Sequence, residues 1–359
     1  MMGPLSIQSW MAVASGFVLV SFLIPLLCRP AEYLGLLDLP DNRKLHGEPV
    51  PMIGGIAMFI AFCIGLLIIP EPLRPYASLV VGMGVLLATG LVDDALDIAP
   101  ASKLIMQILA AVLMVSWGEV QVHSLGNLFG TGNLELGEWA IPFTVLATVF
   151  MINAINMADG TDGLAGGLAV IILIFLAFIG SMNGVREAFI AVALLLAASA
   201  SGFLVFNLRT PWRRKASVFM GDAGAMMLGF AIAWLAVHLS QHPSATVFPI
   251  TIAWLLVLPV TDLVSSYFRR LIRGQSPFSA DSEHLHHILL RAGLRVPTIV
   301  SFMFAVQILF ATVGLLGWYW QWPESYLFIG LIGVFAVHYM LSIRAWKLMK
   351  WVKGLNKED

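Results

Sequence analysis

The sequence predicts an all-α protein that crosses a membrane about eleven times. Of its 359 residues, 59% are hydrophobic and only 11% are charged, and the mean hydropathy is +0.88. A soluble domain carries roughly 25% charged residues, so this composition excludes an ordinary soluble protein. Apolar stretches close to the length that crosses a bilayer recur along the whole chain. We therefore expect one integral-membrane domain over residues 1–359.

Eleven apolar stretches are predicted to be membrane-spanning helices. They lie at about 7–28, 52–69, 76–92, 102–118, 139–157, 164–182, 187–207, 223–240, 247–268, 298–318 and 325–343. The first stretch is long for a secretion signal and has no basic residue before it, so we interpret it as a retained helix. The last two stretches and a basic tail make up residues 298–359.

The basic residues predict how the chain is inserted. Lys and Arg accumulate in short loops on the cytoplasmic side of membrane proteins. With a periplasmic amino terminus and a cytoplasmic carboxyl terminus, eighteen of the twenty Lys and Arg residues face the cytoplasm, and only Arg74 and Arg186 do not. All eleven aspartates fall on the same side, whereas the acidic residues of the other side are glutamates. We expect the chemistry to reside in the cytoplasmic loops.

The first polar motif, VDDALD, follows the third stretch and contains Asp93, Asp94 and Asp97. If the helix continues, Asp93 and Asp97 share a face, with Asp94 about a quarter-turn away. Carboxylates packed this closely repel one another unless a cation or basic group lies among them. The pattern DDxxD also binds magnesium diphosphate in soluble prenyl synthases, so it indicates magnesium and phosphate without defining one enzyme. A solvated helix end is the alternative for this motif taken alone.

The second motif, NAINMADGTDGL, ends the fifth stretch. Asn153, Asn156, Asp159 and Asp162 recur every three residues, and the two glycines permit a tight turn or the close approach of a ligand. Helix capping explains one or two of these four residues but hardly all of them. We therefore expect the motif to be functional.

Two further motifs lie on the same predicted side. Asp222, in FMGDAG, opens the eighth stretch and is either a helix N-cap, a metal ligand, or both. His284, His286 and His287 lie in the long loop after the ninth stretch. Without cysteine or an HExxH spacing, zinc explains these histidines poorly. Imidazoles beside arginines suit the recognition of a sugar or a diphosphate better.

Together these motifs resemble a known family. VDDALD, NAINMADGTDGLAGG, VFMGDAG and SPFSADSEHLHHILLRAG are similar in order and spacing to the motifs of the polyprenyl-phosphate N-acetylhexosamine-1-phosphate transferases. The branch that makes undecaprenyl-diphospho-GlcNAc is the most similar, and the motif-bearing region covers residues 41–293. Muramoyl-pentapeptide transferases typically carry lysine at the position of Asp97 and three consecutive histidines where this chain reads HLHH, which disfavours the peptidoglycan branch.

The resemblance implies a reaction, a cofactor and a location. GlcNAc-1-phosphate would pass from cytoplasmic UDP-GlcNAc to undecaprenyl phosphate and release UMP, with Mg2+ required and Mn2+ as its substitute. FucNAc, QuiNAc and GalNAc stay open as alternatives within the UDP-N-acetylhexosamine donors. A bacterial inner membrane, a product for enterobacterial common antigen or O-antigen, and a homodimer are also implied. No nucleic acid partner is expected.

The resemblance also assigns roles to residues. The expected catalytic residues are Asp93, a candidate base for the lipid phosphate, with Asp94, Asp159 and Asp162. The expected metal ligands are Asp222, Asp94 and Asp97. The expected substrate-binding residues are Asn153, Asn156, His284, His286, His287, Lys44, Lys103 and Arg270, of which the last three rest on charge and location alone.

The ninth stretch contains Pro259 and, three residues later, Asp262. A proline inside a helix removes a backbone hydrogen bond and commonly bends the helix. A carboxylate near membrane depth usually faces the protein interior or water. We predict that these residues border a groove for the polyprenyl tail in the membrane lipid. The alternative is a packing kink whose aspartate is satisfied internally.

A function of another class is also considered. An ion-coupled transporter would place Asp and Asn at membrane depth, but it would not need so many carboxylates in the loops of one face. A structural membrane protein leaves the four polar motifs unexplained.

Overall fold

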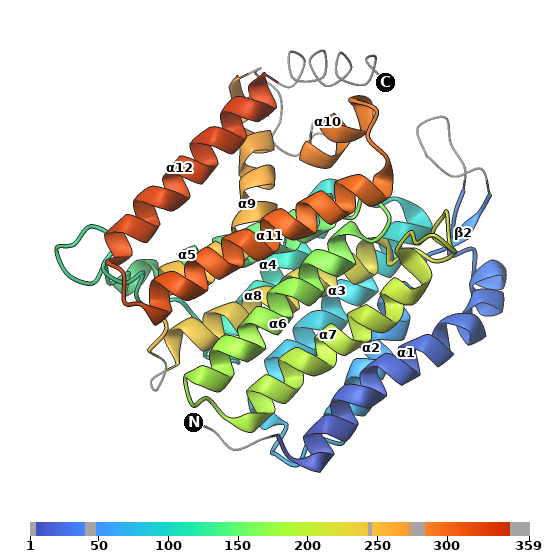
Figure 1. Ribbon diagram of the computed structural model, residues 1–359. Coiled ribbons are helices and arrows are strands. Elements are labelled where there is room, and N and C mark those ends of the chain that lie inside the picture. Colours follow the sequence, from blue (N-terminus) through green and yellow to red (C-terminus); the bar gives the residue numbers. More distant parts are fainter. Residues whose placement is uncertain (1–4, 40–47, 243–245, 273, 275–283, 345–359) are drawn as a thin grey trace.

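The computed structural model describes residues 5–39, 48–242, 246–272, 274 and 284–344, and over these residues the chain is mostly helical (Figure 1). Each predicted stretch corresponds to one helix. These helices are α1 (Ile7–Leu34), α2 (Gly54–Leu66), α3 (Ala77–Leu96), α4 (Pro100–Ser116), α5 (Ala140–Ala158), α6 (Leu164–Met182), α7 (Glu187–Asn207), α8 (Gly221–Gln241), α9 (Pro249–Ile272), α11 (Val296–Tyr319) and α12 (Glu324–Ile343). The predicted all-α polytopic fold is confirmed.

Two of these helices are short for a membrane span. Within the described ranges, nine helices are long and apolar enough to cross a bilayer, whereas α2 has 13 residues and α4 has 17. A further short helix, α10 (Leu285–Arg291), follows α9 and was not expected from the apolar pattern. It carries two of the three histidines of the HLHH motif.

Helix α8 forms the centre of the bundle. It packs against α2, α3, α5 and α6, and its large side chains Phe230 and Trp234 are completely buried. A helix that is apolar on every side is stable when other helices or lipid keep it away from water. The sequence of α8, GDAGAMMLGFAIAWLAVHLSQ, is of this type and also contains small residues that let neighbouring backbones approach.

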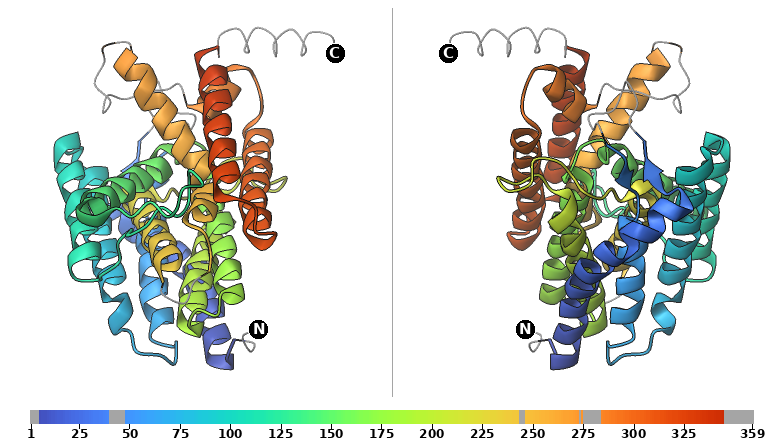
Figure 2. Two further views of the ribbon diagram at one scale, coloured as in Figure 1. Left: turned by 90° about the vertical axis from the view of Figure 1, so that its left-hand side faces the viewer. Right: turned by 90° about the vertical axis from the view of Figure 1, so that its right-hand side faces the viewer.

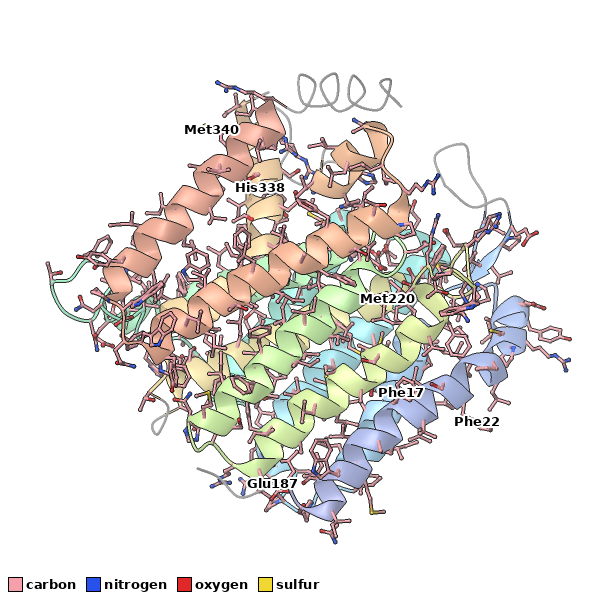
Figure 3. The ribbon with its side chains drawn as sticks, in the orientation of Figure 1. Phe17, Phe22, Glu187, Met220, His338 and Met340 are labelled. Atoms are coloured by element: carbon pink, nitrogen blue, oxygen red, sulfur yellow. The ribbon has the colours of Figure 1, made fainter. Side chains whose placement is uncertain are left out.

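The outer helices expose apolar side chains. Phe22 on α1 and Met340 on α12 point away from the bundle, as Figure 3 shows, and are 67% and 55% exposed. Such surfaces are favourable against lipid tails, because lipid replaces water as the solvent there. Helix α1 begins at one end of the bundle and α12 ends at the other (Figures 1 and 2).

One end of the bundle collects the segments that carry the polar motifs. Helices α3 and α5 end there, α8 begins there, and α9 extends past its neighbours toward α10 (Figure 2). The antiparallel strands β1 (Leu37–Asp38) and β2 (Val50–Pro51) lie at the same end. The Phe219 N–H donates to the Pro51 carbonyl at 2.9 Å, which fixes the start of α8 beside α2.

Candidate active site

The start of α8 lies directly against the end of α3. A Cβ atom at Gly90 would collide with the backbone of Ala223, so the two helices touch at this point without an intervening side chain. One turn further along α3, Asp94 Oδ1 accepts a hydrogen bond of 3.0 Å from the backbone N–H of Asp222. The first N–H groups of a helix lack partners within that helix. Asp94 therefore supplies one of these partners from a different helix.

Gly221 makes this contact possible. Its φ is +69°, a conformation that side-chain-bearing residues rarely adopt, and a Cβ atom there would collide with the Asp94 carboxylate. Asp222 lies in the first turn of α8, whose N-cap is Met220. The predicted N-cap role of Asp222 is therefore wrong, because the helix begins one residue before it.

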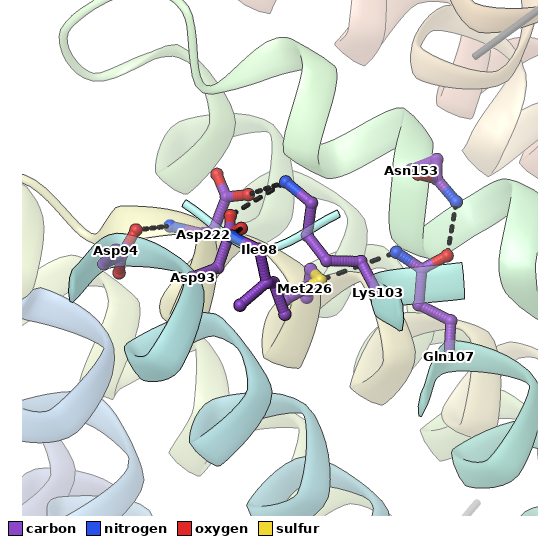
Figure 4. Close-up of polar contacts among 8 residues, drawn as sticks. All are labelled: Asp93, Asp94, Ile98, Lys103, Gln107, Asn153, Asp222 and Met226. Atoms are coloured by element: carbon purple, nitrogen blue, oxygen red, sulfur yellow. Dashed lines mark hydrogen bonds and ion pairs between the residues drawn. The ribbon is translucent and has the colours of Figure 1, made fainter. Parts of the chain in front are cut away.

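Lys103 joins the carboxylates of α3 and α8. Its Nζ donates to Asp93 Oδ2 at 2.8 Å and to Asp222 Oδ2 at 3.1 Å (Figure 4). Asp93 Oδ1 also accepts from the backbone N–H of Ile98 at 3.1 Å. We call Asp93, Asp94, Asp222 and Lys103 the acid cluster. The short α3–α4 connection brings the lysine back to the aspartates that precede it.

Asp97 lies outside the acid cluster. Helix α3 ends at Leu96, and Asp97 has a left-handed conformation with φ of +49° and an exposed side chain. Its N–H donates to the Asp93 carbonyl at 2.8 Å. The helix therefore does not continue through the motif, and Asp97 does not share a face with Asp93. Its position reverses the chain toward α4.

The two asparagines of the second motif have different neighbours. Asn153 Nδ2 donates to Gln107 Oε1 at 2.7 Å, and this contact joins α5 to α4 (Figure 4). Gln107 is buried and also contacts Met226 Sδ at 3.5 Å. Asn156, one turn further along α5, lies near the Asp222 carboxylate. Of the two, Asn156 is therefore the one whose side chain lies beside the acid cluster.

Asp162 stabilises the loop that leads into α8. Its Oδ2 accepts from Arg209 Nε at 2.7 Å and from the Ala216 N–H at 3.2 Å. Asp159 follows the last residue of α5 and is only partly exposed. Desolvation, followed by the negative charges of Asp222, Asp94 and Asp162, raises the pKa of Asp159 well above its usual value. A positive charge bound nearby would therefore stabilise its ionised form.

The sequence analysis missed Asn207. This buried residue accepts from the Gly163 N–H at 2.7 Å and donates to the Val218 carbonyl at 2.9 Å. It thus connects the turn of the second motif to the segment before α8. The sequence did contain an indication of this role, because Asn207 is an amide at the end of a long apolar helix. Such a group must find hydrogen-bond partners when it is buried.

The histidine motif packs on the turn between α5 and α6. A Cβ atom at Gly160 would lie 2.7 Å from His286 Nε2, so only glycine leaves room for the ring. His286 is completely buried, and neither ring nitrogen has a hydrogen-bond partner within the described residues. Desolvation, together with neighbouring His287, lowers the pKa of His286 to about 3. The rings of His286 and His287 lie 4.2 Å apart between centroids.

The remaining predicted residues are placed as follows. Arg270 is buried near the end of α9, with its guanidinium 5.7 Å from the centre of the Tyr267 ring. Lys44 lies outside the described residues. Pro259 and Asp262 are buried, and the Asp262 carboxylate contacts His284 at 3.2 Å. These contacts fit the alternative of an internally satisfied aspartate, and the groove for the polyprenyl tail stays a prediction.

The acid cluster has the charge and the donor atoms that suit a divalent cation. Two of its three carboxylates, Asp93 and Asp222, contact the one ammonium group, and Asp94 Oδ2 is buried without a hydrogen-bond partner. Mg2+ is a hard cation that prefers such oxygen ligands. In the part of the chain that the structure describes, no three Asp, Glu, His or Cys side chains are already grouped as a metal site. Lys103 instead bridges two of the carboxylates.

Membrane-spanning helices with carboxylates, amides and imidazoles gathered at one end define an integral-membrane enzyme. The model of glycosyl transferase family 4 matches residues 76–240. The undecaprenyl-phosphate alpha-N-acetylglucosaminyl 1-phosphate transferase of Escherichia coli (strain K12) is 32% identical over 329 residues, which are 91% of this chain and 89% of the relative. The Haemophilus influenzae protein of the same name is 34% identical over 343 residues, with 94% and 95% covered. The chain belongs to glycosyl transferase family 4, and the resemblance seen in its motifs is confirmed.

Proposed function

We propose that this protein transfers GlcNAc-1-phosphate from UDP-GlcNAc to undecaprenyl phosphate, giving undecaprenyl-diphospho-GlcNAc and UMP. The observation that carries the proposal is the convergence of four motifs at one end of the bundle. Asp94 on α3 accepts a hydrogen bond from the Asp222 N–H on α8. His286 packs against Gly160, which is more than a hundred residues earlier in the sequence. The relatives that match along nearly the whole chain are named for this reaction.

The residues of the site suit phosphoryl transfer. This chemistry depends on alignment and charge neutralisation more than on covalent participation of the protein. Lys103 supplies a fixed positive charge between Asp93 and Asp222, where an incoming phosphate can be oriented. The lipid phosphate is already largely ionised at neutral pH, so Asp93 contributes more by positioning than as a base.

The proposal includes Mg2+, with Mn2+ as a substitute, held by Asp222 and Asp94 with the Asn156 amide nearby. A divalent cation bound there would neutralise charge on the donor diphosphate and on the leaving UMP. Asp159 lies close enough to the carboxylates of Asp222 and Asp94 for their charges to raise its pKa. Asp159 therefore belongs to the same site, on the side that faces the histidine motif.

The histidine motif is proposed to bind the donor. The rings of His284, His286 and His287 lie 4.2–6.3 Å from one another between centroids, and His286 packs against the turn that contains Asp159. Neutral imidazoles can donate and accept hydrogen bonds to a sugar or a phosphate. GlcNAc is the favoured sugar, and FucNAc, QuiNAc and GalNAc are the alternatives.

We further propose that the protein resides in a bacterial inner membrane with this site facing the cytoplasm, and that it acts as a homodimer. The distribution of Lys and Arg supports this orientation. The family assignment favours the transferase over an ion-coupled transporter. The product would then serve O-antigen or enterobacterial common antigen synthesis.

The test is a transferase assay with the purified protein, undecaprenyl phosphate, Mg2+ and a panel of UDP-N-acetylhexosamines. UMP release should depend on both the lipid and the cation, and it should be fastest with UDP-GlcNAc. Excess EDTA should stop turnover, and added Mn2+ should restore it. Turnover that persists in EDTA, or faster release with another UDP-sugar, would overturn the metal or the donor part of the proposal. Transport of label into liposomes without UMP release would favour the transporter.

A further inference from the structure

Asp262 lies at the centre of a buried polar network that links three helices. Its Oδ2 is 3.2 Å from His284 Nδ1, and its Oδ1 accepts from the Leu285 N–H at 3.0 Å. Leu285 is the first residue of α10, so the carboxylate of α9 also caps the helix that carries His286 and His287. Asp262 and His284 are 7% and 3% exposed, which shields their contact from competition with water.

A third helix contributes to the same network. His338 on α12 has its Nε2 3.5 Å from Asp262 Oδ1, and its Nδ1 lies 3.0 Å from Ser265 Oγ on α9. Figure 3 shows His338 on the side of α12 that faces α9, opposite to the outward-pointing Met340. The carboxylate is therefore surrounded by the Leu285 N–H and by two imidazoles. An ionised carboxylate only accepts hydrogen bonds, and the Leu285 N–H and the His284 ring can donate to it, whereas His338 Nε2 lies at ion-pair distance without a hydrogen bond.

This arrangement determines the tautomer of His284. If Asp262 accepts from Nδ1–H, the proton of the neutral ring is on Nδ1, and Nε2 is left as the acceptor. Within the described residues Asp262 provides the hydrogen bond to the His284 ring. Nε2 is then the ring atom that is left to accept a hydrogen bond. A hydrogen bond on one ring nitrogen commonly sets the role of the other in this way.

We propose that Asp262 is a positioning residue that holds His284 as the Nδ1–H tautomer and anchors the start of α10, so that the histidine motif is oriented toward the turn at Gly160. This inference rests on the proposed function, because the donor is the ligand that the motif is expected to bind. A purely structural role of Asp262 would affect both substrates alike. The positioning role predicts a change in the binding of the donor and in the tautomer of His284.

The first test separates the two substrates kinetically. Asp262→Asn keeps the size of the side chain and an acceptor for Leu285, but its amide group would donate to His284 Nδ1 and favour the Nε2–H tautomer. An incorrect tautomer and a misplaced ring weaken function by roughly ten-fold or more. We expect the KM for UDP-GlcNAc to rise by about this factor, while the KM for undecaprenyl phosphate changes by less than about two-fold. Asp262→Glu, which keeps the charge, should recover part of the loss.

Thr261→Val is the matched control. Thr261 is the adjacent buried residue of α9, and its hydroxyl donates within its own helix to the Leu258 carbonyl at 3.2 Å. Its replacement should leave both KM values close to those of the wild type. Equal rises of both KM values in Asp262→Asn, or an unchanged enzyme, would overturn the proposal.

The second test detects the tautomer directly. Histidine labelled with 15N gives distinct signals for protonated and unprotonated ring nitrogens, and the signal of His284 is the one that His284→Gln removes. The wild type should show the Nδ1–H form of His284 and Asp262→Asn the Nε2–H form. A wild-type Nε2–H form overturns the proposal even if Asp262→Asn does not fold. This measurement needs no turnover, so absence of transferase activity would reject the proposed function and leave the role of Asp262 to be decided by the spectrum.

Discussion

At the scale of single residues, the acid cluster is a site where negative charge exceeds positive charge. Asp94 gives one oxygen to the N–H of Asp222 and keeps the other buried without a partner. Lys103 bridges Asp93 and Asp222 and is the cation that the described side chains provide there. Opposite charges at these distances lower the mutual repulsion of carboxylates. The ammonium group should therefore matter for both substrate alignment and the geometry of the aspartates.

Lys103→Met should reduce transferase activity by at least about ten-fold, because removal of one aligned charge commonly costs far more than a change at the surface. Methionine keeps an apolar chain of similar length, so α4 should remain in place. UMP release would be measured at saturating substrate. Ser102→Ala, at the exposed neighbouring position, is the control and should retain wild-type activity. Equal activities of the Lys103→Met and wild-type proteins would contradict this role.

The lowered pKa of His286 predicts that the stability of the protein depends on pH. The pKa of this residue falls from the usual 6.5 to about 3 in the folded protein. Between these values the unfolded chain binds one more proton at this residue than the folded chain, so the free energy of unfolding falls as pH decreases below about 6.5. The thermal midpoint in detergent should drop between pH 6.5 and 4.5.

His286→Gln should show a smaller drop over the same interval, because the variant has no imidazole at this position to protonate. Between pH 7.5 and 8.5 His286 is neutral in both states, and the curves of the two proteins should run parallel. A slope below pH 6.5 that is identical in the two proteins would show that His286 is not the group responsible.

At the scale of elements, the contact of α3 with α8 sets the position of the aspartates. Small residues allow helices in membranes to pack with their backbones close together. Gly90 faces the backbone of Ala223, and Asp94 is four residues further along α3. Any separation of the two helices at Gly90 would move Asp94 away from Asp222. A glycine with no chemistry of its own therefore supports the active-site geometry.

Gly90→Ala should lower stability by about 1–3 kcal/mol, since the added methyl group meets backbone atoms that cannot rotate away. Transferase activity should fall as well. Gly84→Ala is the matched control on the same helix, because its Cβ would lie 3.5 Å from Phe59 Cζ, an ordinary contact. The control should be as stable as the wild type or slightly more stable, given the better helix propensity of alanine. A Gly90→Ala protein with wild-type stability and activity would refute the close contact.

At the scale of the whole molecule, the asymmetry of charge along the chain predicts its orientation in the membrane. The polar motifs all lie at one end of the bundle, and the loop between α4 and α5 lies at the other (Figures 1 and 2). Eighteen of the twenty Lys and Arg residues belong to segments that the sequence predicts on the same side as the motifs. The predicted cytoplasmic location of the site therefore depends on the whole set of loops.

Cysteine labelling in intact cells should test this orientation. In a protein whose Cys28 and Cys63 are replaced by alanine, Asn133→Cys should react with an impermeant maleimide from outside. Ser217→Cys should react only after the membrane is opened. Both positions are exposed, and both variants should be labelled in detergent, which is the control for accessibility. The opposite pattern would reject the proposed orientation.

Much of the fold was predictable because hydrophobicity in a bilayer is a local property. Each apolar stretch became a helix, since a lipid environment requires every segment to satisfy its own backbone hydrogen bonds. The length of α2 and the end of α3 at Leu96 were less predictable. The left-handed turn at Asp97 and the short helix α10 are both determined by neighbouring segments. Neither the turn nor the short helix has a periodic pattern of apolar residues that would predict it from the sequence.

The candidate site was predictable as a set of residues and only partly as an arrangement. Asp93, Asp94 and Asp222 were expected to converge, and they do so through Lys103 and a backbone N–H. Asp262 was expected at a lipid groove, and its contact with His284 was not expected. A carboxylate at membrane depth requires a partner. Its sequence neighbours cannot reveal whether that partner is a lipid headgroup, water or a histidine more than twenty residues away.

The sequence by itself determined that this chain is a polytopic helical membrane protein, and it predicts which way its charges orient it and which polar residues carry its chemistry. These properties follow from composition, span length and motif spacing, which all act locally along the chain. Only the tertiary structure decided that Asp94 caps α8, that His286 packs on Gly160 and that Asp262 holds His284. Each of these contacts joins segments far apart in sequence, and their meeting depends on how closely the helices pack.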